Sequence, residues 1–197
     1  MEIVNIVLLG PPGAGKGTQG ELLSKLMNTP RISTGDMLRD AAASGSALAA
    51  SVDKTLVDGD LVSDDIVVGL IKERLLIADC AHGAIFDGFP RTIRQAKELD
   101  DILAGQHAEI DLVISLEIVD DILVKRVKQR EAAGSGRQDD NAETLKNRLA
   151  VYHRTASPLL AYYHAQGKLE CLSGLPPIAV VSDEIATMVR RAERKPI

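Results

Sequence analysis

Nine residues near the start of the sequence combine glycines, a lysine and a threonine at a spacing suited to phosphate binding. They read Gly10-Pro11-Pro12-Gly13-Ala14-Gly15-Lys16-Gly17-Thr18. Because glycine has no Cβ, such a loop can wrap closely around an anion and direct backbone N–H groups toward it. Lys16 adds a mobile positive charge, and the stretch therefore predicts a phosphate-binding loop.

The position after the lysine departs from the usual form of these loops. A Ser or Thr normally follows the lysine, and its hydroxyl binds Mg²⁺. Here that position is Gly17, and the hydroxyl comes one residue later, on Thr18. An ordinary glycine turn is the alternative interpretation, but the lysine and the flanking strand and helix favour a phosphate-binding loop.

A carboxylate and several arginines complete the candidate chemistry. Ile85-Phe86-Asp87 predicts a short buried strand ending in an acid that could hold Mg²⁺, directly or through water. A loop-capping aspartate is the alternative. Phosphoryl transfer depends chiefly on positioning and positive charge around the moving group. Arginines near these motifs are therefore candidates, although each taken singly could be a surface residue: Arg39, Arg91, Arg126, Arg130, Arg137 and Arg148.

Short apolar runs alternate with helical stretches along the chain. We expect strands at 3–9, at 85–87, at 111–118 and at 168–172, and a very short strand within 31–36 that ends in a turn. We expect helices at 19–27, 36–43, 47–57, 63–78, 92–104, 120–130, 140–166 and 177–191, with Ser63 capping the fourth and an Asp140–Glu143 capping box opening the seventh. This alternation predicts an α/β fold with a parallel sheet, helices on both faces, and a ligand at the carboxyl ends of the strands.

Length, charge and composition argue against several classes of protein. The 197 residues suit one domain, and the net charge of −5 argues against a nucleic-acid-binding surface. We expect no signal peptide, and no apolar run approaches the length of a membrane span. Cys80 and Cys171 are isolated, so we expect reduced thiols and a cytoplasmic location. The four histidines show no metal-ligand spacing and are expected at the surface.

Four motifs in order resemble the adenylate kinase family. They are GPPGAGKGT at 10–18, ISTGDMLR at 32–39, DGFPRTIRQA at 87–96 and GRQDDN at 136–141. The resemblance covers nearly the whole chain and accounts for Gly17, since the family carries GKGT. It implies reversible phosphoryl transfer from MgATP to AMP, giving two ADP. It also implies a three-layer P-loop fold with a central five-stranded parallel sheet, a small helical AMP-binding insert and a short lid.

The resemblance further implies roles for individual residues. ATP would be bound by Gly13, Ala14, Gly15, Lys16, Gly17, Thr18, Arg126, Arg130, Gly174 and Pro176. AMP would be bound by Thr34, Arg39, Asp60, Leu61, Val62, Gly88, Phe89, Pro90, Arg91, Gln95, Arg137 and Arg148, with Gln95 on the adenine. The catalytic set would be Lys16, Asp87, Arg91, Arg126, Arg130, Arg137 and Arg148. Mg²⁺ would be held through nucleotide phosphates and water, with Asp87 and Thr18 nearby.

The same resemblance divides the chain. One P-loop kinase domain, 1–197, would comprise a core (1–32, 63–125, 139–197), an AMP-binding insert (33–62) and a short lid (126–138). Some relatives hold zinc in a longer lid through cysteines, but no cysteine lies in this lid. We therefore expect no zinc. The expected partners are ATP, AMP and ADP, with neither nucleic acid nor membrane, and we expect a monomer.

Three alternatives stay open on the sequence. A UMP/CMP kinase shares the fold and most arginines, but that family typically has Ala at the position of Thr34. A donor site that prefers GTP is the second. A nucleotide-dependent switch is the third, although such a protein would not need the combination of Thr34, Arg39 and Gln95.

Overall fold

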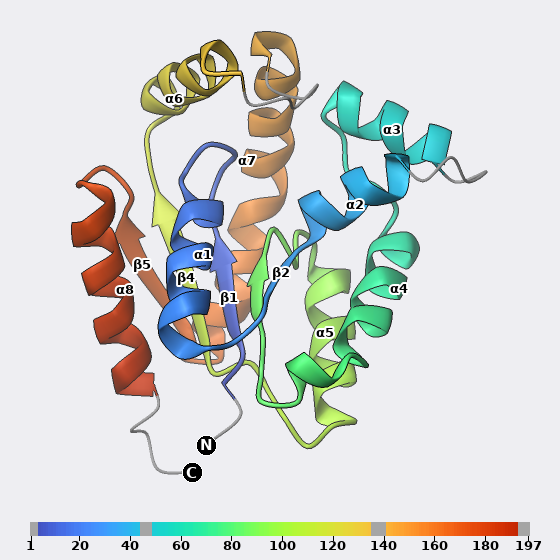
Figure 1. Ribbon diagram of the computed structural model, residues 1–197, viewed down its shortest axis with the longest axis vertical. Coiled ribbons are helices and arrows are strands. Elements are labelled where there is room, and N and C mark those ends of the chain that lie inside the picture. The colour runs from blue at the N-terminus through green and yellow to red at the C-terminus, as the bar shows by residue number, and fades with distance from the viewer. Residues whose placement is uncertain (1–3, 44–48, 135–140, 193–197) are drawn as a thin grey trace.

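A single parallel sheet organises the chain. The computed structural model describes residues 4–43, 49–134 and 141–192. Within them the strand order is β2-β3-β1-β4-β5 (Figure 1). The strands are β1 (Ile6–Leu9), β2 (Arg31–Ser33), β3 (Ile85–Asp87), β4 (Leu112–Glu117) and β5 (Leu169–Ser173). The predicted α/β fold with a five-stranded parallel sheet is confirmed.

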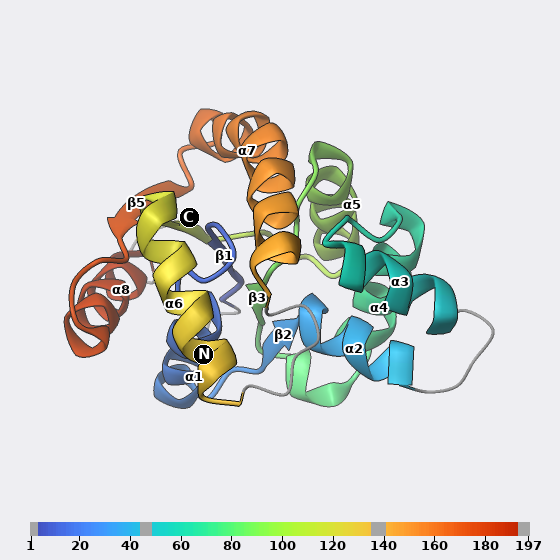
Figure 2. The same ribbon diagram turned by 90° about the horizontal axis from the view of Figure 1, so that it is seen from above.

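Helices connect the strands and cover both faces of the sheet. They are α1 (Lys16–Met27), α2 (Thr34–Ala43), α3 (Ala49–Asp58), α4 (Asp64–Leu75), α5 (Ile93–Ala104), α6 (Asp120–Ala132), α7 (Ala142–Ala165) and α8 (Ile178–Ala192), with a 3₁₀ turn at Ala78–Cys80. Buried side chains of α1, α6 and α8 pack on one face, those of α4 and α5 pack on the other, and α7 contributes to both. Helices α2 and α3 lie beyond the sheet, to one side of the phosphate loop (Figure 2).

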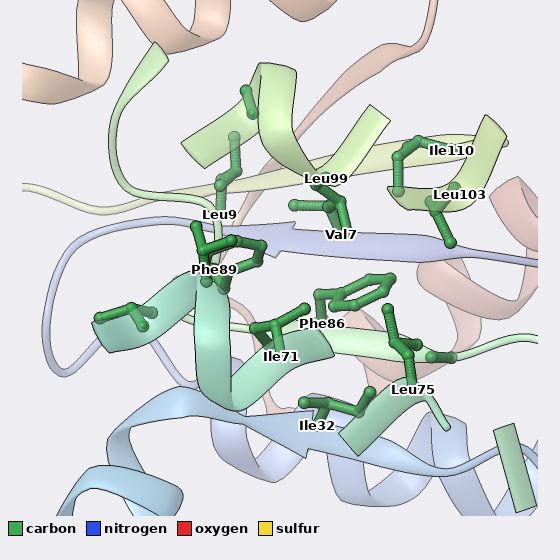
Figure 3. Close-up of a cluster of buried hydrophobic side chains, with 14 of the residues drawn as sticks. Val7, Leu9, Ile32, Ile71, Leu75, Phe86, Phe89, Leu99, Leu103 and Ile110 are labelled. Atoms are coloured by element: carbon green, nitrogen blue, oxygen red, sulfur yellow. The ribbon is translucent and has the colours of Figure 1, made fainter. Parts of the chain in front are cut away.

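Alternate residues of the strands belong to two separate clusters of buried side chains, one on each face of the sheet. In β1, Val7 belongs to the cluster beneath α4 and α5, whereas Ile6 and Leu8 belong to the cluster beneath α1 and α8. This is the period of two expected for a strand covered on both faces. Figure 3 shows the first cluster, in which Phe86 and Phe89 lie between α4 and α5 and are both fully buried.

The register of the sheet brings the phosphate loop next to Asp87. Leu8 pairs with Asp87 across β1 and β3, and Leu9 pairs with Ser115 across β1 and β4. Because the strands are parallel, the loop after β1 and the acid at the end of β3 emerge at the same edge of the sheet. The two motifs thus lie close together because β1 and β3 are neighbours in the sheet.

The starts of α1 and α7 differ from the sequence-based expectation for local reasons that the structure shows. Helix α1 begins at Lys16 rather than at Gln19, because the loop passes directly into the helix through Gly15, which has φ 100°. Helix α7 has Asn141 as its N-cap, and the Asn141 side chain accepts a hydrogen bond of 2.9 Å from the backbone N–H of Thr144. The expected Asp140–Glu143 capping box is therefore wrong; Asp140 itself lies outside the described residues.

Two smaller expectations have mixed outcomes. Ser63 is the N-cap residue of α4, as expected, but its side chain makes no capping hydrogen bond. The four histidines are all exposed, as expected. None of the helices in the described ranges is long and apolar enough to cross a membrane.

Candidate functional site

The phosphate loop joins β1 to α1 at the carboxyl edge of the sheet. Gly10 has φ 142°, and a Cβ at this position would lie 2.8 Å from the carbonyl oxygen of Leu116 on β4. Glycine is therefore required where the loop leaves the sheet. The first N–H groups of α1 have no partner within the helix and carry the positive end of its dipole. Together the loop and the helix N-terminus form a place for an anion.

Lys16 lies inside this loop. Its Nζ donates hydrogen bonds to the carbonyl oxygens of Gly10 at 2.7 Å and Pro11 at 2.9 Å. The pKa of Lys16 is lowered to about 8, chiefly by burial; the negative charge of Asp87 opposes this shift, and the nearby positive charges of Arg91, Arg148 and Arg130 contribute to it. An anion that enters the loop would favour the ammonium form again.

The departure at Gly17 has a structural explanation. A Cβ built there would lie 3.4 Å from Nη2 of Arg31 and 3.7 Å from Oδ2 of Asp87. A serine or threonine hydroxyl would extend further and contact this ion pair. The hydroxyl of Thr18 instead belongs to a residue that is exposed at the mouth of the loop.

Asp87 belongs to a chain of ion pairs that sequence reasoning did not find. Arg31 donates to Oδ2 of Asp87 from Nη2 at 2.7 Å and from Nε at 3.1 Å, and Nη2 also reaches Oδ2 of Asp36 at 3.2 Å. Arg39 in turn donates to Asp36. Although burial raises the pKa of Asp36, hydrogen bonds from Arg39 and Ser33 and the charge of Arg31 hold it below its usual value.

A second set of side chains gathers around Gly88, one residue after β3. The hydroxyl of Thr34 donates to the carbonyl oxygen of Gly88 at 2.9 Å, and Nε of Arg91 donates to the same oxygen at 2.8 Å. Thr34 is only 1% exposed. Gly88 thus fixes one side chain from α2 and one from the loop before α5.

The opposite end of the site is built from α6 and the loop after β5. Nη2 of Arg126 donates to the carbonyl oxygen of Gly174 at 2.8 Å, and Nη1 lies 3.5 Å from the carbonyl oxygen of Ala14. A Cβ at Gly174 would lie 2.7 Å from Cδ1 of Ile118 and 3.2 Å from the oxygen of Ala14. The 174–178 loop therefore approaches the phosphate loop closely, and Arg126 connects the two.

The phosphate loop from Pro12 onward, the Arg31–Asp87 ion pair and the side chains at both ends of the site line one pocket of about 960 Å³. Among the described residues, seven basic side chains contribute to its wall: Lys16, Arg31, Arg39, Arg91, Arg126, Arg130 and Arg148. In a chain of net charge −5 this local excess of positive charge marks a site for a polyanion. The volume is near the top of the range of about 300–1,000 Å³ for small-molecule pockets.

Most residues singled out in the sequence lie on the wall of this pocket. The wall includes Gly13 to Thr18, Thr34, Arg39, Asp60 to Val62, Asp87, Gly88, Arg91, Gln95, Arg126, Arg130, Arg148, Gly174 and Pro176. Phe89 does not, because its side chain is fully buried in the core. Pro90 instead lines a smaller cavity of about 80 Å³ that adjoins Lys16 and Arg148. Arg137 lies outside the described residues.

Arg31 and Asp36 are two charged wall residues that the sequence analysis missed. Asp36 stands within the ISTGDMLR motif, and Arg31 directly precedes it. A basic residue at the start of a strand that ends beside the phosphate loop is the signal that could have identified Arg31. The described residues contain no group of three or more His, Cys, Asp or Glu that could hold a metal ion.

The fold and the pocket define a P-loop protein that binds nucleotide phosphates. Comparison with known proteins identifies the family. The family model of adenylate kinase matches residues 8–168. The chain is 45% identical to the adenylate kinase of Parvibaculum lavamentivorans (98% of this chain, 95% of the relative), and 49% identical to that of Phenylobacterium zucineum (96% and 97%). It is 47% identical to the adenylate kinase of Leptospira biflexa (91% and 96%). The chain belongs to the adenylate kinase family.

Proposed function

We propose that this pocket binds ATP at the end formed by α6 and the 174–178 loop, and AMP at the end formed by α2, α3 and Gly88. The reaction is reversible transfer of the γ-phosphoryl group of ATP to AMP, which yields two ADP. The observation that carries the proposal is the position of the phosphate loop and Lys16 between two ends that are both lined by arginines.

The charges of the wall suit the transfer itself. The moving group carries negative charge on several oxygens, so a site accelerates transfer mainly by fixed positive charge and exact placement. We assign Lys16, Arg91, Arg126, Arg130 and Arg148 to this task, and Arg137 from the family resemblance alone. Thr34, Arg39, the 60–62 segment, Gly88 to Arg91 and Gln95 are assigned to AMP.

The residues present suit a magnesium ion held chiefly by the nucleotide. Asp87 is a carboxylate at the pocket wall, but its Oδ2 already accepts two hydrogen bonds from Arg31, and Thr18 offers only a hydroxyl. Mg²⁺ commonly keeps several waters and binds through one carboxylate plus phosphates. When bound, the ion would neutralise part of the phosphate charge, and Asp87 would orient one of its waters.

The wider assignments are proposals of the same kind. The proposed division is a core, an AMP-binding insert at 33–62 and a short lid at 126–138. Support comes from α2 and α3, which form a separate helical pair beyond the sheet. Residues of a single chain line both ends of the pocket, so the proposed reaction does not need a second copy, and we propose a monomer. The free thiols Cys80 and Cys171 suit the reducing cytoplasm.

The test follows ADP by ³¹P NMR in mixtures of the protein with ATP and Mg²⁺, with and without AMP. We expect ADP only when AMP is present, with two ADP formed for each AMP consumed. ADP from ATP alone at the same rate would instead indicate a hydrolase, and equal kcat/KM values for AMP and CMP would indicate a UMP/CMP kinase.

A variant pair locates the reaction in this pocket. Lys16→Ala is expected to lower kcat by about 10²-fold or more, since it removes a cation from the phosphate loop. Lys25→Ala is the matched control, because Lys25 is exposed on the same helix. Unchanged turnover in the Lys16 variant would contradict the assignment.

A further inference from the structure

Both ends of the Gln95 side-chain amide are already held by groups of the protein. Nε2 donates a hydrogen bond to Oδ1 of Asp64 at 2.7 Å, and Oε1 accepts one from the backbone N–H of Arg91, also at 2.7 Å. Gln95 is 2% exposed, yet it contributes to the wall of the large pocket. Its amide is thus a buried polar group whose orientation matters to anything that binds against it.

The two partners allow only one orientation of the amide. An ionised carboxylate can only accept hydrogen bonds, so Asp64 must face Nε2. A backbone N–H can only donate, so the Arg91 amide must face Oε1. A reversed side chain would place donor against donor at one end and acceptor against acceptor at the other. Each such mismatch would leave buried groups unsatisfied.

Thr92 fixes the second oxygen of Asp64. The Thr92 hydroxyl accepts a hydrogen bond from the backbone N–H of Gln95 at 3.1 Å as the N-cap of α5. Its own proton is therefore free to be donated to Oδ2 of Asp64, which lies 3.1 Å away. Both carboxylate oxygens of Asp64 are thus engaged by residues at the start of α5.

We propose that Asp64 is a positioning residue that sets the purine preference of the acceptor site, by locking the amide of Gln95 in one orientation. This inference rests on the proposed function, in which Gln95 meets the base of the acceptor nucleotide. The remaining N–H of Nε2 and the remaining lone pair of Oε1 then face the base in a fixed order.

That fixed order distinguishes two purines of nearly the same shape. Adenine presents an acceptor at N1 and a donor at its exocyclic amine, which one orientation of an amide can pair. Hypoxanthine presents a donor at N1 and an acceptor at its carbonyl oxygen, which needs the reversed orientation. A site whose polar groups cannot turn rejects the mismatched base, because pairing groups are then left unsatisfied.

Asp64 acts through Gln95 rather than on the nucleotide. It is not among the described residues of the pocket wall, and it lies in the first turn of α4. A carboxylate in that turn also stabilises the helix, because it lies near the positive end of the helix dipole. Asp65 shares this second role, but its side chain pairs with Arg94 at the surface and is 78% exposed. Asp65 therefore offers a control that separates the two effects.

The test compares AMP with IMP as acceptors for Asp64→Asn and Asp65→Asn in the full chain. Asparagine has the same shape as aspartate but can donate as well as accept, so the reversed Gln95 amide loses one of its two mismatches and is then opposed only by the backbone N–H of Arg91. We expect Asp64→Asn to reduce the ratio of kcat/KM for AMP to that for IMP by about tenfold, the effect of one hydrogen bond. Asp65→Asn should leave the ratio within about twofold of the wild-type value, as surface changes do.

The outcomes distinguish the inference from the function on which it rests. An equal loss for AMP and IMP in Asp64→Asn, with the ratio unchanged, would mean that Asp64 has a structural role only, and would overturn the inference. A wild-type protein that forms no ADP from ATP and AMP would contradict the proposed function instead. That outcome is visible before any variant is made.

A second measurement does not depend on a folded variant. In a ¹⁵N–¹H spectrum of the wild-type protein, we expect one pair of Gln95 side-chain amide resonances with slow exchange against solvent. Two sets of resonances, or rapid exchange, would show that the amide turns, and would overturn the inference.

Discussion

The side chain of Arg31, from the first residue of β2, reaches Asp87, the last residue of β3, at a distance of 2.7 Å between Nη2 and Oδ2. In the register of the two strands Arg31 lies opposite Ile85, so its side chain extends along the sheet past Phe86 to reach the acid. The pair places a positive and a negative charge side by side next to the phosphate loop. Arg31 attracts the phosphates of ATP, whereas Asp87 repels them and attracts a divalent cation. The two charges together should therefore determine the affinity for ATP with and without Mg²⁺.

The first prediction concerns this balance. Arg31→Gln removes one positive charge and leaves the Asp87 carboxylate uncompensated, and both changes repel free ATP. We expect ATP in EDTA to bind about tenfold more weakly, the effect of losing a charge-assisted contact. Part of this loss should be recovered with Mg²⁺, because the freed carboxylate attracts the cation. Titration calorimetry in EDTA and in Mg²⁺ measures both affinities.

Arg94→Gln is the control for that experiment. It makes the same change of charge, but the Arg94 side chain is 60% exposed and pairs with Asp65. Equal weakening of ATP binding in both variants would mean that net charge alone, rather than the Arg31–Asp87 pair, is responsible.

The second prediction concerns protons. The pKa of Lys16 is lowered, chiefly by burial, to about 8. At pH 9 the Lys16 amine is therefore neutral in most molecules of the free protein. The phosphates of bound ATP favour the ammonium form and raise the pKa, so binding should take up a proton from the buffer. Calorimetry at pH 9 in two buffers of different ionisation enthalpy measures the uptake. Lys16→Met should abolish it; an equal binding enthalpy in both buffers for the wild type would contradict the prediction.

The third prediction concerns the turn at Gly88, which has φ 78°. A Cβ there would lie 3.1 Å from Nη2 of Arg91 and 3.3 Å from Oγ1 of Thr34, so Gly88→Ala should displace two residues assigned to AMP. We expect KM for AMP to rise about tenfold, because small misplacements at a reacting site are costly. The free energy of unfolding should fall by about 1 kcal/mol from backbone strain.

Gly167→Ala separates strain from displacement. Gly167 has φ 69°, similar to that of Gly88, but nothing lies within 4 Å of its Cβ position. We expect the same loss of stability in denaturant unfolding and an unchanged KM for AMP. A similar rise in KM for both variants would attribute the effect to stability rather than to Arg91 and Thr34.

The sequence was sufficient for the sheet and for most of the pocket wall. Strand and helix periods are local properties, and the phosphate loop, Asp87 and Gly88 are adjacent to strand ends, which the order of a parallel sheet brings together. What it did not provide were contacts made by long side chains across elements. Arg31 reaches Asp87, and Asp64 reaches Gln95, over 56 and 31 positions of the chain respectively. Those pairings depend on register and rotamer, which no local pattern encodes.

The last prediction concerns the contact between α7 and the end of α3. Nδ2 of Asn147 donates to the carbonyl oxygen of Asp58 at 2.7 Å and to Oδ1 of Asp60 at 3.0 Å. The hydroxyl of Thr144 donates to the carbonyl oxygen of Val57 at 2.8 Å. These bonds tie the 57–60 segment, which adjoins the proposed AMP site, to the helix that carries Arg148.

Asn147→Ala should loosen this tie without altering a residue assigned to either nucleotide. We expect KM for AMP to rise about fivefold, the effect of one or two hydrogen bonds, while KM for ATP changes less than twofold. Lys146→Ala, at an exposed position of the same helix, should leave both values unchanged. Steady-state kinetics with each substrate varied in turn measures the four constants. An equal rise in both KM values for the Asn147 variant would show that α7 as a whole has shifted, and that the contact does not act on the AMP end specifically.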